Sequence, residues 1–305
     1  ISGSNSNVTI SSGVTVSGSG DQNWTLTNST GSLWDLVVED EDDVLNTGTA
    51  TTLTNLGTIS AGDDWGILND TNASFTSLSN SGAISASADF GIYNKGLITS
   101  MSNTGTISAG RNWGIYNDAS ATITTLTNTG TISASGNDIG IYNATSSTIA
   151  TLNNSQGASG SALTYQGKLP TNYNVIVNST TDFGKTIFSD VSGQTNFGVH
   201  SGSTLSEGTY SSVLSGLTAS EIASGTSGTL VSGATRSDWT LANNTGSEWD
   251  LVVGNKDITD DTKTSVVKSV KSNTVLGVNN LTSVTEVNFA NMNTYDCDLF
   301  DKHKV

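Results

Sequence analysis

One stretch of the chain, from Leu53 to Ala144, repeats a single pattern four times and decides the fold. The copies read LTNLGTISAGDDWGILND from Leu53, LSNSGAISASADFGIYNK from Leu78, MSNTGTISAGRNWGIYND from Met101 and LTNTGTISASGNDIGIYNA from Leu126. A decayed fifth copy, LNNSQGASGSA, starts at Leu152, so that successive copies begin 23 to 26 residues apart. A fixed period of this kind is the signature of a repeat architecture.

Several columns keep one residue type through all four copies. They are Asn55, Asn80, Asn103 and Asn128; Gly57, Gly82, Gly105 and Gly130; Ile59, Ile84, Ile107 and Ile132; Gly66, Gly91, Gly114 and Gly140; Ile67, Ile92, Ile115 and Ile141; and Asn69, Asn94, Asn117 and Asn143. Each residue of the first isoleucine column is followed by Ser-Ala. Such columns provide the apolar core positions and the turn residues of stacked coils. We therefore interpret them as structural positions and not as a ligand site.

Short runs of Thr, Ile and Ser that are broken by Asn and Gly are typical of strands and turns. The unit is too short for a helix-pair repeat or a propeller blade. The pattern therefore predicts a right-handed parallel β-helix with about three short strands in each coil and about 4.8 Å between coils. The isoleucine columns are expected to form buried rows, and the Asn columns to form amide ladders. We expect residues 1–255 to form one solenoid of about ten coils.

The segments on either side of the repeats complete a four-part plan. We expect N-terminal β coils at 1–52, regular repeats at 53–157, an irregular C-terminal β-helix and cap at 158–255, and a helical or extended linker and tail at 256–305. The chain also carries a long-range duplication, because NWTLTNSTGSLWDLVV at Asn23–Val38 returns as DWTLANNTGSEWDLVV at Asp238–Val253. Each copy alternates apolar and polar residues around a Thr-Gly turn, which is typical of a hairpin with tryptophan anchors.

The charge and the composition of the chain exclude several kinds of partner and site. The 305 residues include 11 Lys+Arg and 27 Asp+Glu, which gives a formal net charge of −16. Nucleic acids and anionic membranes are therefore not expected as partners, because both need clustered basic side chains. One Cys excludes an intrachain disulfide framework, and two His exclude most His-based metal sites. No apolar run approaches the roughly 18 residues of a membrane-spanning helix.

Three segments outside the repeats resemble a known family. They read LPTNYNVIVNSTTDFGKTIFS from Leu169, GTYSSVLSGLTASEIASGTSG from Gly208 and DWTLANNTGSEWDLVV from Asp238. They resemble the C-terminal end of the passenger domains of bacterial autotransporters, the type V secreted surface proteins, and in particular those of marine bacteria. The tail MNTYDCDLFDKHKV, from Met292, is similar to the join between such a passenger and its translocator barrel.

The resemblance implies an exported β-helix, extracellular or at the bacterial cell surface. Association with the outer membrane would run only through a barrel that is not part of this chain, and residues near 258–295 would cross its pore as a linker. In the family a second Cys follows the one in the tail, whereas Cys297 has no second Cys in this chain, and its role stays open.

The sharpest enzymatic hypothesis is cleavage of a polysaccharide, which needs converging carboxylates. The candidates at related repeat positions are Asp63, Asp64, Asp89, Arg111 and Asp138. The two aligned repeat positions that hold them read Asp-Asp, Ala-Asp, Arg-Asn and Asn-Asp in the four copies. Such variation is typical of a solvated turn. We therefore expect no catalytic residue, and an extracellular carbohydrate-active lyase or glycosidase stays the alternative.

Calcium is the one cofactor that the sequence leaves open. The acidic run at Glu39–Asp43 and the looser group of Asp257, Asp260 and Asp261 supply the hard oxygen ligands that Ca²⁺ prefers. Neither has EF-hand spacing or the glycine-rich calcium repeat. Solvated acidic loops are the favoured interpretation, and no bound metal or cofactor is expected.

Binding is expected through aromatic side chains. Tyr93, Tyr116 and Tyr142 share a column with Leu68, and strand alternation next to the inward isoleucine column places this column outward. Such a stripe is a platform for surface glycans, for other proteins or for self-association, and the alternative is a ladder that only stacks on itself. We expect a non-enzymatic surface solenoid that acts in adhesion or as a structural fibre, with the side chains of its outer face free to vary.

Overall fold

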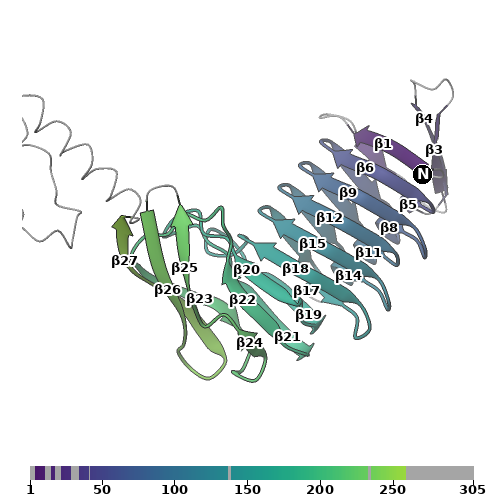
Figure 1. The fold of residues 1–305 in the computed structure, drawn as a ribbon. Coiled ribbons are helices and arrows are strands. Elements are labelled where there is room, and N and C mark those ends of the chain that lie inside the picture. Colours follow the sequence, from purple (N-terminus) through teal and green to yellow (C-terminus); the bar gives the residue numbers. More distant parts are fainter. Residues whose placement is uncertain are drawn as a thin grey trace, which may run out of the picture.

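The computed structural model describes a chain whose strands stack into a solenoid (Figure 1). Its described residues are 4–10, 15–17, 22–28, 34–40, 42–136, 139–232 and 235–258. All regular secondary structure in these ranges is β-strand. A search of the same ranges finds no helix with the length and apolar character needed to span a membrane.

Each regular coil contributes one strand to each of three sheets. Sheet 1 contains, in order, β1 (Ser4–Ile10), β6 (Thr49–Asn55), β9 (Ser74–Asn80), β12 (Leu97–Asn103), β15 (Thr122–Asn128), β18 (Thr148–Asn154), β20 (Asn172–Val175), β22 (Thr195–Val199) and β24 (Ile222–Ser224). Sheet 2 contains β2 (Thr15–Ser17), β7 (Thr58–Ala61), β10 (Ala83–Ala86), β13 (Thr106–Ala109) and β16 (Thr131–Ala134).

Sheet 3 spans the whole described solenoid and continues into the C-terminal hairpins. It contains, in order, β5 (Asp42–Asn46), β8 (Trp65–Asn69), β11 (Phe90–Asn94), β14 (Trp113–Asn117), β17 (Ile139–Asn143), β19 (Leu163–Lys168), β21 (Thr186–Ser192), β23 (Gly208–Ser215), β27 (Glu248–Ile258), β26 (Thr235–Asn243) and β25 (Ser227–Ser232). A separate two-stranded sheet joins β3 (Gln22–Asn28) to β4 (Trp34–Asp40).

The predicted parallel β-helix is confirmed. Ile107 pairs in parallel with Ile84 on one side and with Ile132 on the other, and its strand keeps this register without a shift. The stack makes about seven turns, fewer than the ten that the coil length suggested. The difference arises because the described ends of the chain contain antiparallel hairpins in place of further coils.

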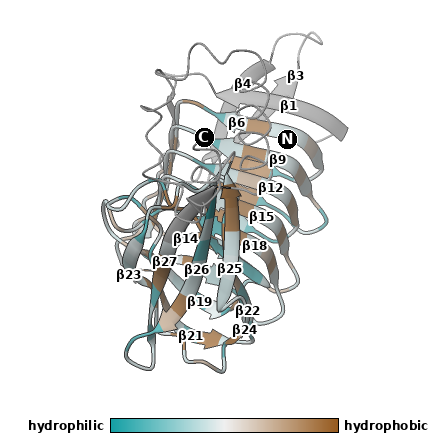
Figure 2. Ribbon diagram, turned by 60° about the vertical axis from the view of Figure 1, so that its left-hand side comes forward, coloured by the Kyte–Doolittle hydropathy of each residue, from teal (hydrophilic) through white to brown (hydrophobic). Residues whose placement is uncertain are grey.

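The core consists of aligned apolar rows, as the repeat predicts. The first isoleucine column is 0–1% exposed and the second is 0% exposed, so both rows are buried along the stack. Sheet 1 adds a third row that includes Leu78, Met101 and Leu126, and all three rows belong to one continuous core. Figure 2 shows this alternation, with the apolar positions of β6, β9 and β12 lying in line.

Two ladders of buried asparagine amides run along the corners of the solenoid. Their members are Asn55, Asn80, Asn103, Asn128 and Asn154 in one, and Asn46, Asn69, Asn94, Asn117 and Asn143 in the other. In each ladder every Nδ2 but that of the last member donates to the Oδ1 of the Asn in the next coil, at 2.7–3.1 Å. Asn103 Nδ2 also donates to the carbonyl oxygen of Thr131 at 3.2 Å, which satisfies a backbone acceptor at the turn.

Glycine is required where successive coils approach at the turn after the first Asn column. A Cβ atom at Gly105 would lie 2.0 Å from the carbonyl oxygen of Gly82, and one at Gly130 would lie 2.0 Å from that of Gly105. No side chain fits at that distance from a backbone atom, so this column tolerates only glycine.

The duplicated tryptophan segments form the two expected hairpins, β3 with β4 and β26 with β27. At the C-terminal end, β27 pairs antiparallel with β23 and so continues sheet 3. The Trp239 ring meets Phe197 edge-on with centroids 5.7 Å apart, and Trp249 Nε1 donates to the carbonyl oxygen of Leu217 at 2.7 Å. The hairpin therefore closes the apolar end of the stack.

Strand β27 runs to Ile258, past the residue at which the linker is expected to begin. The predicted helix or linker beyond Ile258 lies outside the described residues, as does Cys297. The four predicted domain limits stay predictions.

Replacing Ile107 by Asp tests the row assignment. The change would place an unpaired carboxylate in a row that is fully buried, and we expect it to lower the free energy of unfolding by about 4 kcal/mol or more. Thermal or urea unfolding followed by circular dichroism measures the loss. An Ile107→Asp protein that unfolds like the wild type would show that the row is not buried.

Replacing Asn103 by Ala tests the ladder. The variant removes one amide from the stack, and each buried group left without a partner costs about 1–3 kcal/mol. The neighbouring Ser102 is the matched control, because its side chain points outward from the same strand and Ser102→Ala leaves the ladder intact. Equal unfolding midpoints for the two variants would contradict a stabilising role for the ladder.

Candidate functional site

The outer face of sheet 3 carries two columns of aromatic side chains side by side. One column contains Trp65, Phe90 and Trp113, and the other contains Tyr93, Tyr116 and Tyr142. The three tyrosines are half-buried, as the sequence predicts for an outward column at the centre of a sheet. We call these six residues the aromatic face.

The two columns share a face because the two residues between them in each strand both face the core. In β11, Gly91 and Ile92 are both buried, and a Cβ at Gly91 would lie 2.7 Å from the carbonyl oxygen of Gly114 and 2.8 Å from Ile107 Cγ2. Simple alternation would place Phe90 and Tyr93 on opposite faces. The inward glycine shifts the phase, so that both rings lie outside and contact each other with centroids 5.0 Å apart.

The rings of the aromatic face stack mainly on one another. Tyr93 and Tyr116 lie face to face with centroids 5.0 Å apart and planes 7° apart, and Phe90 and Trp113 do the same at 5.5 Å and 5°. Tyr142 stacks on Trp113 at 4.5 Å. The ring faces are therefore largely occupied by neighbours along the solenoid axis.

Charged residues at the turns after β11 and β14 complete this face. The carboxylate of Asp118 accepts hydrogen bonds from the hydroxyls of Tyr93 and Tyr116, both at 2.8 Å, and from the backbone N–H of Ala119 at 2.7 Å. Burial opposes ionisation, but these three hydrogen bonds together with the positive charge of Lys95 outweigh it and hold the pKa of Asp118 below its usual value. Lys95 Nζ lies 4.8 Å from the centroid of the Tyr93 ring, within cation–π range.

The same contacts raise the pKa values of the tyrosines. Burial, followed by the hydrogen bond to the negative Asp118, raises the pKa of Tyr116 to about 12. The pKa of Tyr93 is raised by the same causes in the same order. The aromatic face is thus held together by neutral hydroxyls that donate to one carboxylate.

Only some of the candidate catalytic residues from the sequence lie close together in the structure. Burial raises the pKa of Asp64, and the nearby negative charges of Asp63 and Asp89 add to the effect, so these three lie close together on the stacked turns of two adjacent coils. Asp89 accepts a hydrogen bond from Asn112 Nδ2 at 2.7 Å. Arg111 is exposed on the same side and forms no ion pair with a described carboxylate. Asp138 lies outside the described residues.

No calcium site is apparent in the part of the chain that the structure describes. Within those ranges, no three His, Cys, Asp or Glu side chains are arranged to hold a metal ion. The side chains of the acidic run at Glu39–Asp43 and of Asp257 are not described, and Asp260 and Asp261 lie outside the described ranges. Calcium binding by these residues stays a hypothesis.

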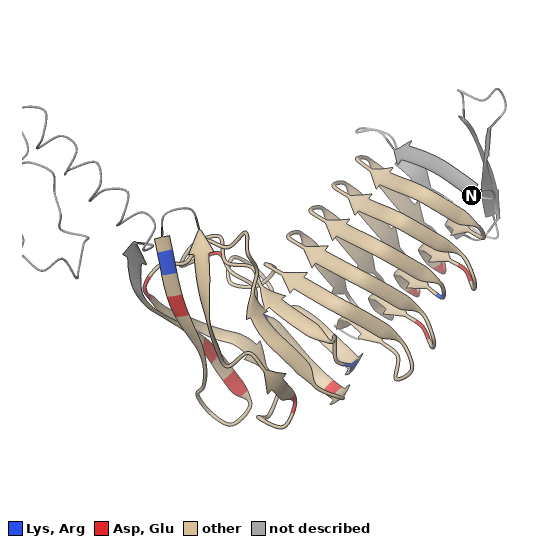
Figure 3. Ribbon diagram, in the orientation of Figure 1, with Lys and Arg blue, Asp and Glu red and all other residues tan. Residues whose placement is uncertain are grey.

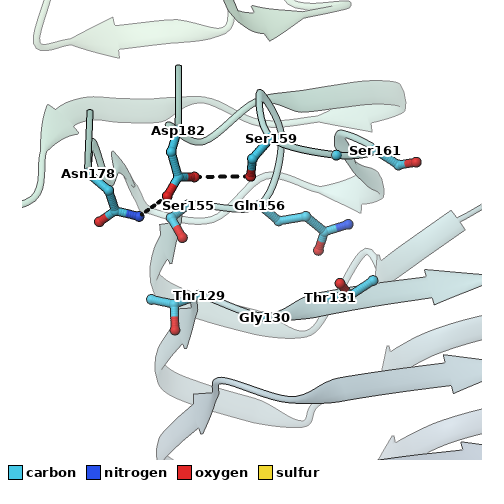
Figure 4. A pocket seen from close by; sticks show the side chains of 11 residues that line it. Thr129, Gly130, Thr131, Ser155, Gln156, Ser159, Ser161, Asn178 and Asp182 are labelled. Atoms are coloured by element: carbon cyan, nitrogen blue, oxygen red, sulfur yellow. Dashed lines mark hydrogen bonds between the residues drawn. The ribbon is translucent and has the colours of Figure 1, made fainter. Parts of the chain in front are cut away.

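A polar cleft that the sequence did not predict lies where sheet 2 ends at β16 (Figure 4). It has a volume of about 380 Å³ and is lined by residues 129–131, 155–157 and 159–161 together with Asn178 and Asp182. The carboxylate of Asp182 is held by Asn178 Nδ2 at 3.0 Å and by Ser159 Oγ at 3.1 Å.

Gln156 closes the core side of this cleft. Its Oε1 accepts from the backbone N–H of Ile132 at 2.8 Å, and its Nε2 donates to the carbonyl oxygen of Ile132 at 3.2 Å. The side-chain amide therefore pairs with β16 as the next strand would have done. The sequence contains one indication of this role. In the decayed fifth repeat, Gln156 occupies the position that is the turn glycine in the other four copies.

Comparisons of this chain with protein-family models, with curated proteins and with solved structures give no match. The fold and the arrangement of its side chains therefore carry the functional argument.

Titration of Tyr116 tests the contacts of the aromatic face. Its pKa is about 12 in the folded chain against 10.0 for a free tyrosine, so the stabilisation is complete below pH 10 and is lost as the pH rises toward 12. We expect Asp118→Asn to lower this pKa, because it removes the negative charge next to the forming tyrosinate. Ultraviolet titration of tyrosinate measures the shift, with Asp182→Asn as a distant control. The same titration curve for both variants would contradict the role of Asp118.

Proposed function

We propose that this protein is a non-enzymatic, extracellular β-solenoid that acts at the cell surface as a structural fibre. One observation carries the proposal, which is that the positions kept constant through the repeats bind one coil to the next. The two amide ladders, the isoleucine rows and the turn glycines all serve this stacking. A chain built in this way is stiff and can be lengthened by whole coils.

Adhesion is the second candidate, and the aromatic face favours it. Six rings gathered on one sheet, with tyrosine hydroxyls, Lys95 and Asp118 beside them, offer both apolar and hydrogen-bonding contacts to a surface glycan or a protein. A ligand would meet ring edges and polar groups at the middle of the ladder. The ring faces that stack on one another, as those of Tyr93 and Tyr116 do, are not available to it.

Export by an autotransporter route belongs to the same proposal. It is supported by the resemblance of the segments from Leu169, Gly208 and Asp238 to passenger domains, and of the segment from Met292 to the join with a translocator barrel. The net charge of −16 suits a soluble rod that is repelled by other acidic surfaces.

The test is to incubate the full 305-residue chain with arrays of glycans and surface proteins and with a panel of soluble polysaccharides. We expect no release of reducing ends or unsaturated products. If adhesion is the role, retention on the array should fall at least tenfold in Tyr142→Ser and stay unchanged in Thr240→Ser. Product release that is abolished by Asp64→Asn or Asp89→Asn would overturn the proposal and establish the polysaccharide-cleaving alternative.

A further inference from the structure

The outer face of sheet 1 carries a block of hydroxyl side chains that recurs in four successive coils, next to the exposed Leu97 of β12. Each strand reads hydroxyl, hydroxyl, apolar, hydroxyl: TTLT from Thr51, TSLS from Thr76, TSMS from Thr99 and TTLT from Thr124. The apolar residue of each strand is buried, and all the hydroxyl residues are half-buried or exposed. Together these side chains form what we call the hydroxyl array.

Strand pairing turns the hydroxyl array into a two-dimensional lattice. In-register pairs align one column of Thr52, Ser77, Ser100 and Thr125 and a second of Thr54, Ser79, Ser102 and Thr127, and the preceding residues supply a third. Hydroxyls along a column repeat with the strand spacing of about 4.8 Å, and the two paired columns are about 6–7 Å apart. Figure 1 shows these strands as parallel, evenly spaced rungs.

The array is free of charge and has a defined end. No Lys, Arg, Asp or Glu occurs in β6, β9, β12, β15 or β18, and these strands contain no charged segment in Figure 3. At the C-terminal edge, Asn153 Nδ2 donates to Thr127 Oγ1 at 3.0 Å. Beyond it, the outward positions change to asparagines that bond to one another, as Asn174 Nδ2 does to Asn153 Oδ1 at 2.8 Å.

Stacking alone does not explain why these positions stay hydroxyl. An outward position on a solvated sheet accepts charged residues readily, and soluble proteins use them there to prevent sheet association. The acidic turn positions of this same solenoid do vary between Asp, Ala, Arg and Asn. The contrast indicates that the uncharged, regularly spaced surface is itself the feature that is retained.

We propose that the hydroxyl array binds ice. A stiff sheet that repeats one hydroxyl at the strand spacing presents oxygen atoms at intervals close to those on the prism face of hexagonal ice. The methyl groups of the threonines, which are half of the residues in the two paired columns, add apolar surface between the hydroxyls. A crystalline polysaccharide is another periodic solid, but its recognition relies on exposed aromatic rings, and the aromatic face of this solenoid lies on sheet 3, whereas Phe75, Tyr173 and Phe197 of sheet 1 are buried.

This activity goes beyond the proposed structural role and does not depend on it. It uses sheet 1, whereas adhesion through the aromatic face would use sheet 3, so the two can succeed or fail separately. The proposed ice binding and the proposed structural role share one requirement, which is that the amide ladders keep the solenoid rigid.

The experiment grows a single ice crystal slowly from a dilute solution of the fluorescently labelled full chain. We expect the wild type to enter the ice and to inhibit recrystallisation. Ser100→Tyr and Thr124→Tyr place a bulky ring within the hydroxyl array, and they should reduce incorporation at least tenfold. Thr240→Tyr is the matched control, because Thr240 is exposed on strand β26 of the C-terminal hairpin and should leave incorporation unchanged.

Circular dichroism checks that each variant is folded, and Ser100→Lys replaces any tyrosine variant that is not. Exclusion of the wild type from the ice would overturn the proposal, and so would equal loss of incorporation in Thr240→Tyr. Retention on crystalline chitin or cellulose, lost in Ser100→Tyr and without incorporation into ice, would overturn it in favour of a polysaccharide surface.

Discussion

The amide ladders are the constraint on which the rest of this structure depends. A buried primary amide has two donors and one acceptor to satisfy, and an unpaired one is costly. In each coil the acceptor bonds the preceding coil while the donors bond the next coil and a turn carbonyl, as at Asn103. Every coil must therefore return an asparagine to the same place. Differences in coil length are confined to the turns, such as the one after Asn94, which is shorter than the one after Asn69.

The ladders also determine how the regular part ends. Asn143 accepts from Ser147 Oγ and donates to the carbonyl oxygen of Lys168, and Asn154 donates to Thr186 Oγ1 at 3.2 Å. Other polar groups thus take the place of the missing asparagine. Gln156 does the same for the backbone of Ile132 at the end of sheet 2. These substitutes allow irregular coils and a hairpin cap to follow without leaving buried amides unpaired.

Much of the core and of the amide ladders could be predicted from the sequence, because equivalent positions of a repeat have the same neighbours in every copy. Columns such as Ile107 and Asn103 occupy one environment in every copy, so their burial and stacking follow from the spacing alone. The aromatic face was predicted only in part, because the paired inward positions of Gly91 and Ile92 break the alternation that the prediction assumed. The hydrogen bond from Tyr93 to Asp118 and the pairing of Gln156 with β16 were not predictable, since Asp118 and Gln156 stand at positions where the residue changes from copy to copy.

The outer surface divides into parts whose side chains vary to different degrees from coil to coil. At the turns before sheet 3, a side chain meets only water and its neighbours above and below, and residues such as Asp63 and Arg111 replace one another. On sheet 3, rings fill the distance between coils and are retained as a stack of mixed aromatics. On sheet 1, threonine and serine would pack equally well beside charged neighbours, yet none occurs. A property that neither stacking nor solubility requires, and that holds through four coils, is best explained by an object outside the protein with the same period.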